Sequence, residues 1–160
     1  MIIVSNTTPL SQLARINQLS LLQEVFTKII IPAEVYAELT QGNHPNTAAF
    51  LVADWLEVRN VSDPDKIKML QADTNLDLGE CAAIILASEL EAQQILIDEK
   101  AARKIAISRN LSVVGTVGIL LIAKQRGLIT NVKTLLDALL IEETYISEQL
   151  YRYALTIAGE

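Results

Sequence analysis

The stretch ILIDEKAARK, residues 95–104, contains the change of character from which the fold can be inferred. A run of branched apolar residues is followed at once by two carboxylates, Asp98 and Glu99, and then by a basic, helix-like segment. A short unbroken apolar run is typical of a strand buried on both faces of a parallel sheet. The two carboxylates then lie at the carboxyl end of this strand, where parallel α/β sheets carry their functional groups.

Other apolar runs alternate with helical patterns along the chain. Strands are expected over residues 2–6, 28–32, 56–60, 94–97 and 112–115, the third being less buried. Helices are expected from Thr8-Pro9, from Pro32 to near Gly42, over 45–54, from Asp63-Pro64, and over 77–91, 99–108, 116–126, 131–141 and 144–158. Thr8 and Thr116 are interpreted as caps, and Gly127 as a helix end. This alternation predicts an α/β fold with a mostly parallel sheet covered on both faces.

The composition fits one domain over residues 1–160. Hydrophobic residues make up 51% of the chain and aromatic residues only 4%, so the core is expected to consist of Leu, Ile, Val and Ala. The longest apolar stretch, 113–123, is too short to span a membrane, and no export leader is recognisable. A cytoplasmic protein without membrane association is therefore expected. Cys81, the one cysteine, is interpreted as a small buried hydrophobic residue.

The charge is unevenly distributed. The net charge is −6, yet residues 100–136 contain seven bases and no acid. These bases are interpreted either as solvated helix faces or as a positive surface beside an acidic site. The last helix carries a second pattern, an apolar stripe of Ile146, Leu150, Tyr153 and Ile157, which is interpreted as core rather than as a partner surface.

Connectivity places several oxygen-bearing side chains at the carboxyl edge of the sheet. Asn6 ends the first strand, and Asp98 and Glu99 end the fourth, while Glu80 opens the helix that leads into the fourth strand. Glu38, in the helix after the second strand, can lean back toward the same edge. Each also has a structural interpretation: Asp98 as the cap of helix 99–108, Glu80 as part of a capping box, Glu38 as an exposed helix residue.

Carboxylates gathered at one edge repel one another, and either their pKa values rise or a cation holds them together. An oxygen-only set without His or Cys suits Mg²⁺ or Mn²⁺. Such an ion can polarise a phosphate and activate a water for attack. The sequence therefore predicts a divalent-metal site at this edge.

Five blocks of the sequence resemble the PIN-domain (PilT N-terminus) family, and in particular its VapC-type ribonuclease toxins. The blocks are IVSNTTPL (3–10), IIIPAEVYAEL (29–39), LGECAAIILASE (78–89), ILIDEKAARKIA (95–106) and VVGTVGILLIAKQRGLI (113–129). The resemblance covers about residues 2–130 and leaves 131–160 as additional C-terminal helices. It implies a three-layer α/β/α fold with a five-stranded parallel sheet in the order 3-2-1-4-5.

The resemblance also implies Mg²⁺- or Mn²⁺-dependent hydrolysis of single-stranded RNA or tRNA, leaving a 5′-phosphate and a 3′-hydroxyl. It places the catalytic positions on Asn6, Glu38, Glu80 and Asp98 and the metal ligands on Glu38, Glu80, Asp98 and Glu99. Thr7 and Thr116 are candidates to support the acids by hydrogen bonds, and Lys100, Arg103 and Lys104 to contact RNA phosphates. A cognate antitoxin and a homodimer are the partners that the resemblance implies.

Asn6 departs from the family pattern, which has aspartate at this position. An asparagine carbonyl can still bind a metal ion but carries no charge, so weaker metal binding is expected. The alternative function is therefore a weakly active or inactive PIN-like module that binds nucleic acid or an antitoxin and oligomerises. Other α/β functions fit less well, because the chain lacks a dinucleotide-binding glycine motif, a P-loop and a receiver-type lysine after the fifth strand.

Overall fold

The computed structural model describes residues 1–41 and 46–160. Within this part of the chain, one five-stranded, all-parallel sheet runs in the order β3-β2-β1-β4-β5, which confirms the predicted topology. The strands are β1 (Ile3–Ser5), β2 (Ile29–Pro32), β3 (Leu56–Arg59), β4 (Gln94–Leu96) and β5 (Val113–Val114).

Alternating residues of the strands pack into two separate hydrophobic cores. Val4 pairs with Ile30 and with Ile95, and all three side chains belong to one core. Their neighbours Ile3 and Leu96 belong to the other core. Both faces of the sheet are thus covered, which explains why the strands read as continuous apolar runs.

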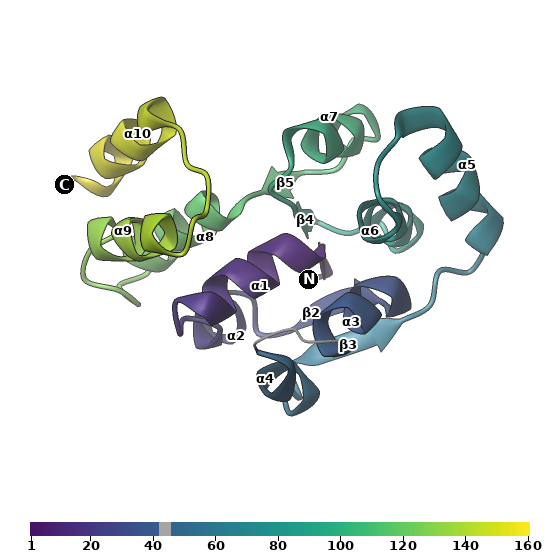
Figure 1. Ribbon diagram of the computed structural model, residues 1–160, viewed down its shortest axis with the longest axis horizontal. Coiled ribbons are helices and arrows are strands. Elements are labelled where there is room, and N and C mark those ends of the chain that lie inside the picture. Colours follow the sequence, from purple (N-terminus) through teal and green to yellow (C-terminus); the bar gives the residue numbers. More distant parts are fainter. Residues whose placement is uncertain (42–45) are drawn as a thin grey trace.

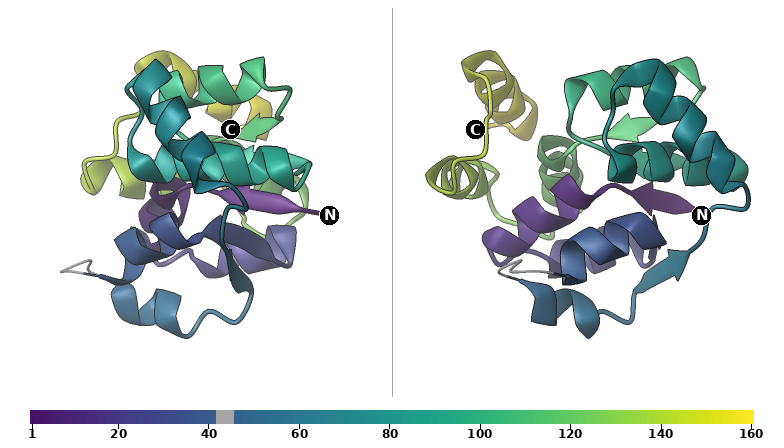
Figure 2. Two further views of the ribbon diagram at one scale, coloured as in Figure 1. Left: turned by 90° about the vertical axis from the view of Figure 1, so that its right-hand side faces the viewer. Right: turned by 45° about the vertical axis from the view of Figure 1, so that its right-hand side comes forward.

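Helices cover the two faces in two groups. One core contains residues of α1 (Thr7–Arg15), α2 (Ser20–Phe26), α3 (Ala33–Thr40), α4 (Thr47–Leu51), α8 (Thr116–Gln125), α9 (Lys133–Ile141) and α10 (Glu148–Ala158). The other contains residues of α5 (Pro64–Thr74), α6 (Leu78–Glu89) and α7 (Lys100–Ser108). Figures 1 and 2 show α8, α9 and α10 gathered at one end of the molecule and α5, α6 and α7 gathered at the other. Within the described residues, no helix has both the length and the apolar character needed to cross a bilayer.

Several helix starts differ from the prediction. The first helix begins at Thr7 with Asn6 as its N-cap, so Thr8 is not the cap, and Pro9 is the third helical residue. Proline is tolerated there because the first helical N–H groups have no partner within the helix. Likewise, Gly115 rather than Thr116 occupies the cap position of α8. The predicted starts and ends at Pro45 and Gly42 lie outside the described residues.

Two local predictions about packing have different outcomes. Cys81 is fully buried in the core between α6 and the sheet, as expected. The interpretation of the C-terminal stripe as core is correct for Ile146, which packs against the core, and wrong for the three residues in α10. Leu150, Tyr153 and Ile157 are 40%, 59% and 57% exposed. The helix packs through another face, centred on the fully buried Ala154. A small residue at that position allows a close approach to α8.

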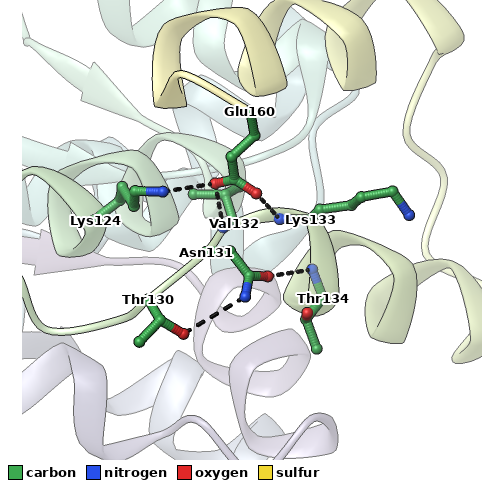
Figure 3. A network of polar contacts seen from close by, with 7 residues as sticks. All are labelled: Lys124, Thr130, Asn131, Val132, Lys133, Thr134 and Glu160. Carbon is green, nitrogen blue, oxygen red and sulfur yellow. Dashed lines mark hydrogen bonds and ion pairs between the residues drawn. The ribbon is translucent and has the colours of Figure 1, made fainter.

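The end of the chain is attached to α9 by one carboxylate. Glu160 accepts hydrogen bonds from the backbone N–H groups of Val132 and Lys133, at 2.6 and 3.0 Å, and an ion pair from Lys124 Nζ at 3.1 Å (Figure 3). The N-cap residue of α9, Val132, has no side chain able to cap the helix. Glu160 therefore provides the negative charge that a helix N-terminus favours.

Candidate active site

The predicted site residues lie at the carboxyl edge of the sheet, where β1 and β4 end side by side. The Asn6 N–H donates a hydrogen bond of 2.9 Å to the Leu96 carbonyl, so the residues that follow the two strands are neighbours. Asn6 is 3% exposed, and its side chain makes no capping hydrogen bond to α1. Its position at this edge agrees with the sequence prediction.

Glu38 reaches this edge from the second half of α3. Thr7 Oγ1 donates a hydrogen bond of 2.7 Å to Glu38 Oε2. The other carboxylate oxygen lies against the first turn of α6, since a Cβ atom built on Gly79 would be only 2.2 Å from Glu38 Oε1. Glu38 as a whole residue is exposed, as its structural interpretation predicts, but its carboxylate is partly shielded from water. This desolvation raises the pKa of Glu38; the Thr7 hydrogen bond opposes the rise and the charge of Asp77 adds to it.

Glu80 lies in the first turn of α6 and takes part in the capping box that its spacing predicts. Asp77 Oδ1 accepts a hydrogen bond from the Glu80 N–H at 2.8 Å, and Glu80 Oε2 accepts one from the Asp77 N–H at 3.3 Å. The structural role does not remove Glu80 from the acidic group. Burial raises its pKa most, and the charges of Asp77, Glu99 and Glu38 raise it further.

Asp98 is held by the start of α8. Its two oxygens accept hydrogen bonds from the Thr116 N–H and Thr116 Oγ1, at 2.7 and 2.6 Å. Its interpretation as the cap of the helix after β4 is therefore wrong: Glu99 occupies that position, while the Asp98 side chain binds α8 instead. Burial raises the pKa of Asp98 despite these hydrogen bonds and the nearby charge of Arg103.

The predicted RNA-contact bases have different environments. Lys100 and Lys104 are exposed, but Arg103 is half-buried and donates a hydrogen bond of 3.1 Å to the Ile97 carbonyl. Other bases of the 100–136 segment have partners outside this edge: Lys124 pairs with Glu160 and Lys133 with Asp137. The interpretation of the whole segment as one positive surface is not supported by this arrangement.

The donor chemistry of the edge fits an oxygen-preferring divalent ion, because amide and carboxylate oxygens gather there and Glu38 and Glu80 have no cationic partner in the described part of the chain. Among the described residues, however, no group of three or more His, Cys, Asp or Glu is arranged to hold a metal ion. Glu38 and Glu80 are within electrostatic reach of each other, whereas Thr116 binds both oxygens of Asp98. The acids thus share an edge but do not form one coordination shell.

Sequence reasoning missed three residues of this site. Gly79 leaves the space that the Glu38 carboxylate occupies, and Asp77 adds a charge to the acidic group. Glu34, one helical turn before Glu38, has a buried Oε1 atom without a hydrogen-bond partner among the described residues. The spacing of Glu34 and Glu38 is a signal that the sequence contained, because residues four apart share a helix face.

A family model described as a PIN domain matches residues 2–160 of the chain. No curated protein matches the sequence.

Proposed function

The chain belongs to the PIN-domain family, since the family model matches it from residue 2 to residue 160, and on this basis we propose that it is a metal-dependent endoribonuclease. PIN domains are generally metal-dependent nucleases. The proposed substrate is single-stranded RNA, including tRNA. The proposed biological role is the toxin of a type II toxin–antitoxin pair, active in the cytoplasm as a homodimer and inhibited by its cognate antitoxin.

One observation carries the proposal: acids from separate segments of the chain lie at the carboxyl edge with raised pKa values. Glu38 comes from α3, Glu80 from α6 and Asp98 from the end of β4. Burial is the largest cause of the raised pKa of each carboxylate. Charged groups in such surroundings are more stable beside a cation, which makes this edge the proposed site of Mg²⁺ or Mn²⁺.

The proposed ligands are Glu38, Glu80, Asp98 and Glu99, with the side-chain carbonyl of Asn6. Because the described acids do not form one coordination shell in this structure, ion binding would require their side chains to turn toward one another. A divalent ion bound there would lower the pKa of a water and offset the charge that develops on a phosphate. Thr7 and Thr116 fix the orientation of Glu38 and Asp98.

Three exposed residues complete the proposed mechanism. Glu99 is the candidate to position the attacking water, and the exposed residues Lys100 and Lys104 are the candidates to contact RNA phosphates near the cleaved bond. Cleavage would leave a 5′-phosphate and a 3′-hydroxyl.

A second candidate function follows from Asn6. This residue is buried at the centre of the edge and brings no charge to it, while Asp98 already has two hydrogen-bond donors. Both features reduce the affinity of the edge for a metal ion. The alternative is therefore a weakly active or inactive module that binds RNA or the antitoxin.

The decisive test compares the parent protein with Asp98→Asn on a pool of RNAs in Mg²⁺, Mn²⁺ or EDTA. The substitution should lower metal-dependent cleavage about 100-fold or more, which corresponds to a loss of about 3 kcal/mol of transition-state stabilisation. The amide can still accept a hydrogen bond from the Thr116 N–H, so the fold should persist.

A matched control is Asp137→Asn, which removes the same charge from α9, outside the acidic edge, and should cleave like the parent. Thermal unfolding of each variant verifies folding. Equal cleavage by the parent and Asp98→Asn would remove Asp98 from the site. No cleavage by the parent in either metal would favour the binding module.

A further inference from the structure

A hollow of about 410 Å³ adjoins the acidic edge, between that edge and the connection from α9 to α10. Asp98, Glu99 and Thr116 line one side, and Thr144, Tyr145 and Ile146 line the opposite side. Figure 1 shows this connection running along the side of α9 and α10 that faces the strands. The volume lies within the range of small-ligand pockets, about 300–1,000 Å³.

We infer that this hollow, the Tyr145 hollow, binds one unpaired nucleobase next to the cleaved phosphodiester, and that Tyr145 stacks on that base. The inference rests on the proposed function, because it assigns a specificity subsite to the same nuclease site.

Tyr145 lies in the connection from α9 to α10 and lines the hollow. Tyr145 is 89% exposed at the rim of the hollow. Core packing therefore does not stabilise the ring in this position. Both faces of such a ring are available to a planar ligand. Aromatic side chains in this situation stack on the bases of single-stranded nucleic acids.

The lining of the hollow combines apolar and polar side chains. Leu139 and Val117 provide apolar surface for a flat ring, while Lys100 brings a positive charge to the same space. Thr144 Oγ1 is buried and has no hydrogen-bond partner among the described residues. A hydroxyl both donates and accepts hydrogen bonds, so it can pair with a polar edge of a base.

The hollow is continuous with the acidic edge. Because Asp98, Glu99 and Thr116 belong both to the proposed catalytic edge and to this hollow, a base inside it would adjoin a phosphate bound at that edge. A base that is paired in a duplex is not free to enter. The hollow therefore favours single-stranded substrates and selects the nucleotide beside the cut.

The test measures binding of a labelled single-stranded RNA by fluorescence anisotropy in EDTA, with the full chain and its variants. A matched set of strands lacks one base at each position in turn. Tyr145→Ala should weaken binding of the intact strand about tenfold, and Tyr145→Phe should bind like the parent because it keeps the ring. On the strand that lacks the selected base, Tyr145→Ala should cause no further loss.

Tyr153→Ala is the control, because Tyr153 is an exposed tyrosine of α10 that does not line this hollow. An equal loss of affinity for Tyr145→Ala on intact strands and on all base-lacking strands would overturn the inference. A loss of affinity for Tyr153→Ala equal to that for Tyr145→Ala would overturn it too.

Cleavage in Mn²⁺ is measured in parallel. If the parent cleaves RNA and Tyr145→Ala binds RNA like the parent, the Tyr145 hollow is not a base-binding site and the nuclease proposal stands. If the effect of Tyr145→Ala on binding depends on one base but the parent does not cleave RNA, the nuclease proposal is wrong and base binding in the Tyr145 hollow stands. If the parent neither binds nor cleaves RNA, both proposals are wrong.

Discussion

Two groups of carboxylates in this molecule have opposite electrostatic surroundings. At the carboxyl edge of the sheet, the pKa values of Glu38, Glu80 and Asp98 are all raised, chiefly by burial. Among the C-terminal helices, the pKa values of Asp137 and Glu160 are lowered. The difference separates acids that stabilise the fold in their charged form from acids that are less stable when charged.

The contacts of Glu160 and Glu80 explain the contrast. Glu160 accepts backbone hydrogen bonds from Val132 and from the next residue, and it pairs with Lys124 (Figure 3). Glu80 also accepts a backbone hydrogen bond, from Asp77, but the charged groups near it are other acids. A divalent ion would bring the edge acids into the same state that hydrogen-bond donors and a lysine give to Glu160.

The variant Glu80→Gln should have the largest effect on the difference between the edge acids and the C-terminal acids. Glutamine keeps the capping interaction with Asp77 but removes the proposed metal-ligand charge. We expect metal-dependent RNA cleavage to fall about 100-fold or more, while the protein without metal unfolds at the same or a higher temperature. Cleavage assays and thermal unfolding in EDTA measure the two effects. A clearly lower unfolding temperature would show that Glu80 acts like the C-terminal acids.

The sequence predicted the sheet and its functional edge because both follow from local patterns and connectivity. Unbroken apolar runs indicate doubly covered strands, and a helix that leads into a parallel strand must begin at the carboxyl edge. Glu80 and Asp98 could be placed in this way. The hydrogen bonds of Asp98 with Thr116 could not, because they depend on side-chain geometry between segments 18 residues apart.

The exposed stripe of α10 was mispredicted for a different reason. The helix has a second set of residues in helical phase, including Tyr151, Ala154 and Leu155, and this set packs on the core. Periodicity identifies an apolar face but does not decide between two of them. The small side chain of Ala154 allows the closer approach, and average hydrophobicity does not report this property.

Asn6→Asp should increase the difference between the edge and the C-terminal helices, because it adds one more acid to the edge. We expect about tenfold or more tighter Mn²⁺ binding and faster cleavage, because cation affinity rises with the number of ligand charges. Without metal, a charged group at this buried position should lower the unfolding temperature. Calorimetric titration and unfolding with and without Mn²⁺ provide the measurements. Unchanged Mn²⁺ affinity would place Asn6 outside the metal site.

Gly79→Ala tests the space around Glu38 and has a smaller expected effect. The new Cβ atom would meet Glu38 Oε1 at 2.2 Å, so the end of the Glu38 side chain must move. We expect cleavage to fall about tenfold, while alanine in place of glycine favours the helix by up to about 1 kcal/mol. The matched comparison is the same substitution in a Glu38→Ala background, where it should have no further effect on cleavage. A loss of equal size in both backgrounds would contradict the contact.

Glu160→Gln has the smallest expected effect and tests the other half of the comparison by its dependence on pH. The pKa of Glu160 lies below its ordinary value of 4.5, so its charged form adds stability above that pH, and the contribution is lost as the pH falls through the lowered value. The variant should therefore unfold a few degrees below the parent near neutral pH, and the two should converge in acid. For Glu80 the sign is reversed: because its pKa is raised above 4.5, its contribution to stability is present below that pH and disappears as the pH rises through the raised value.

Unfolding temperatures measured in EDTA from about pH 3 to pH 7 therefore distinguish the two acids. As the pH rises, the unfolding temperature of Glu160→Gln should fall below that of the parent, and the unfolding temperature of Glu80→Gln should rise above it. A difference for Glu160→Gln that stays constant with pH would mean that Glu160 holds α9 by shape and hydrogen bonding alone, and the two groups of acids would then not differ in the way their surroundings indicate.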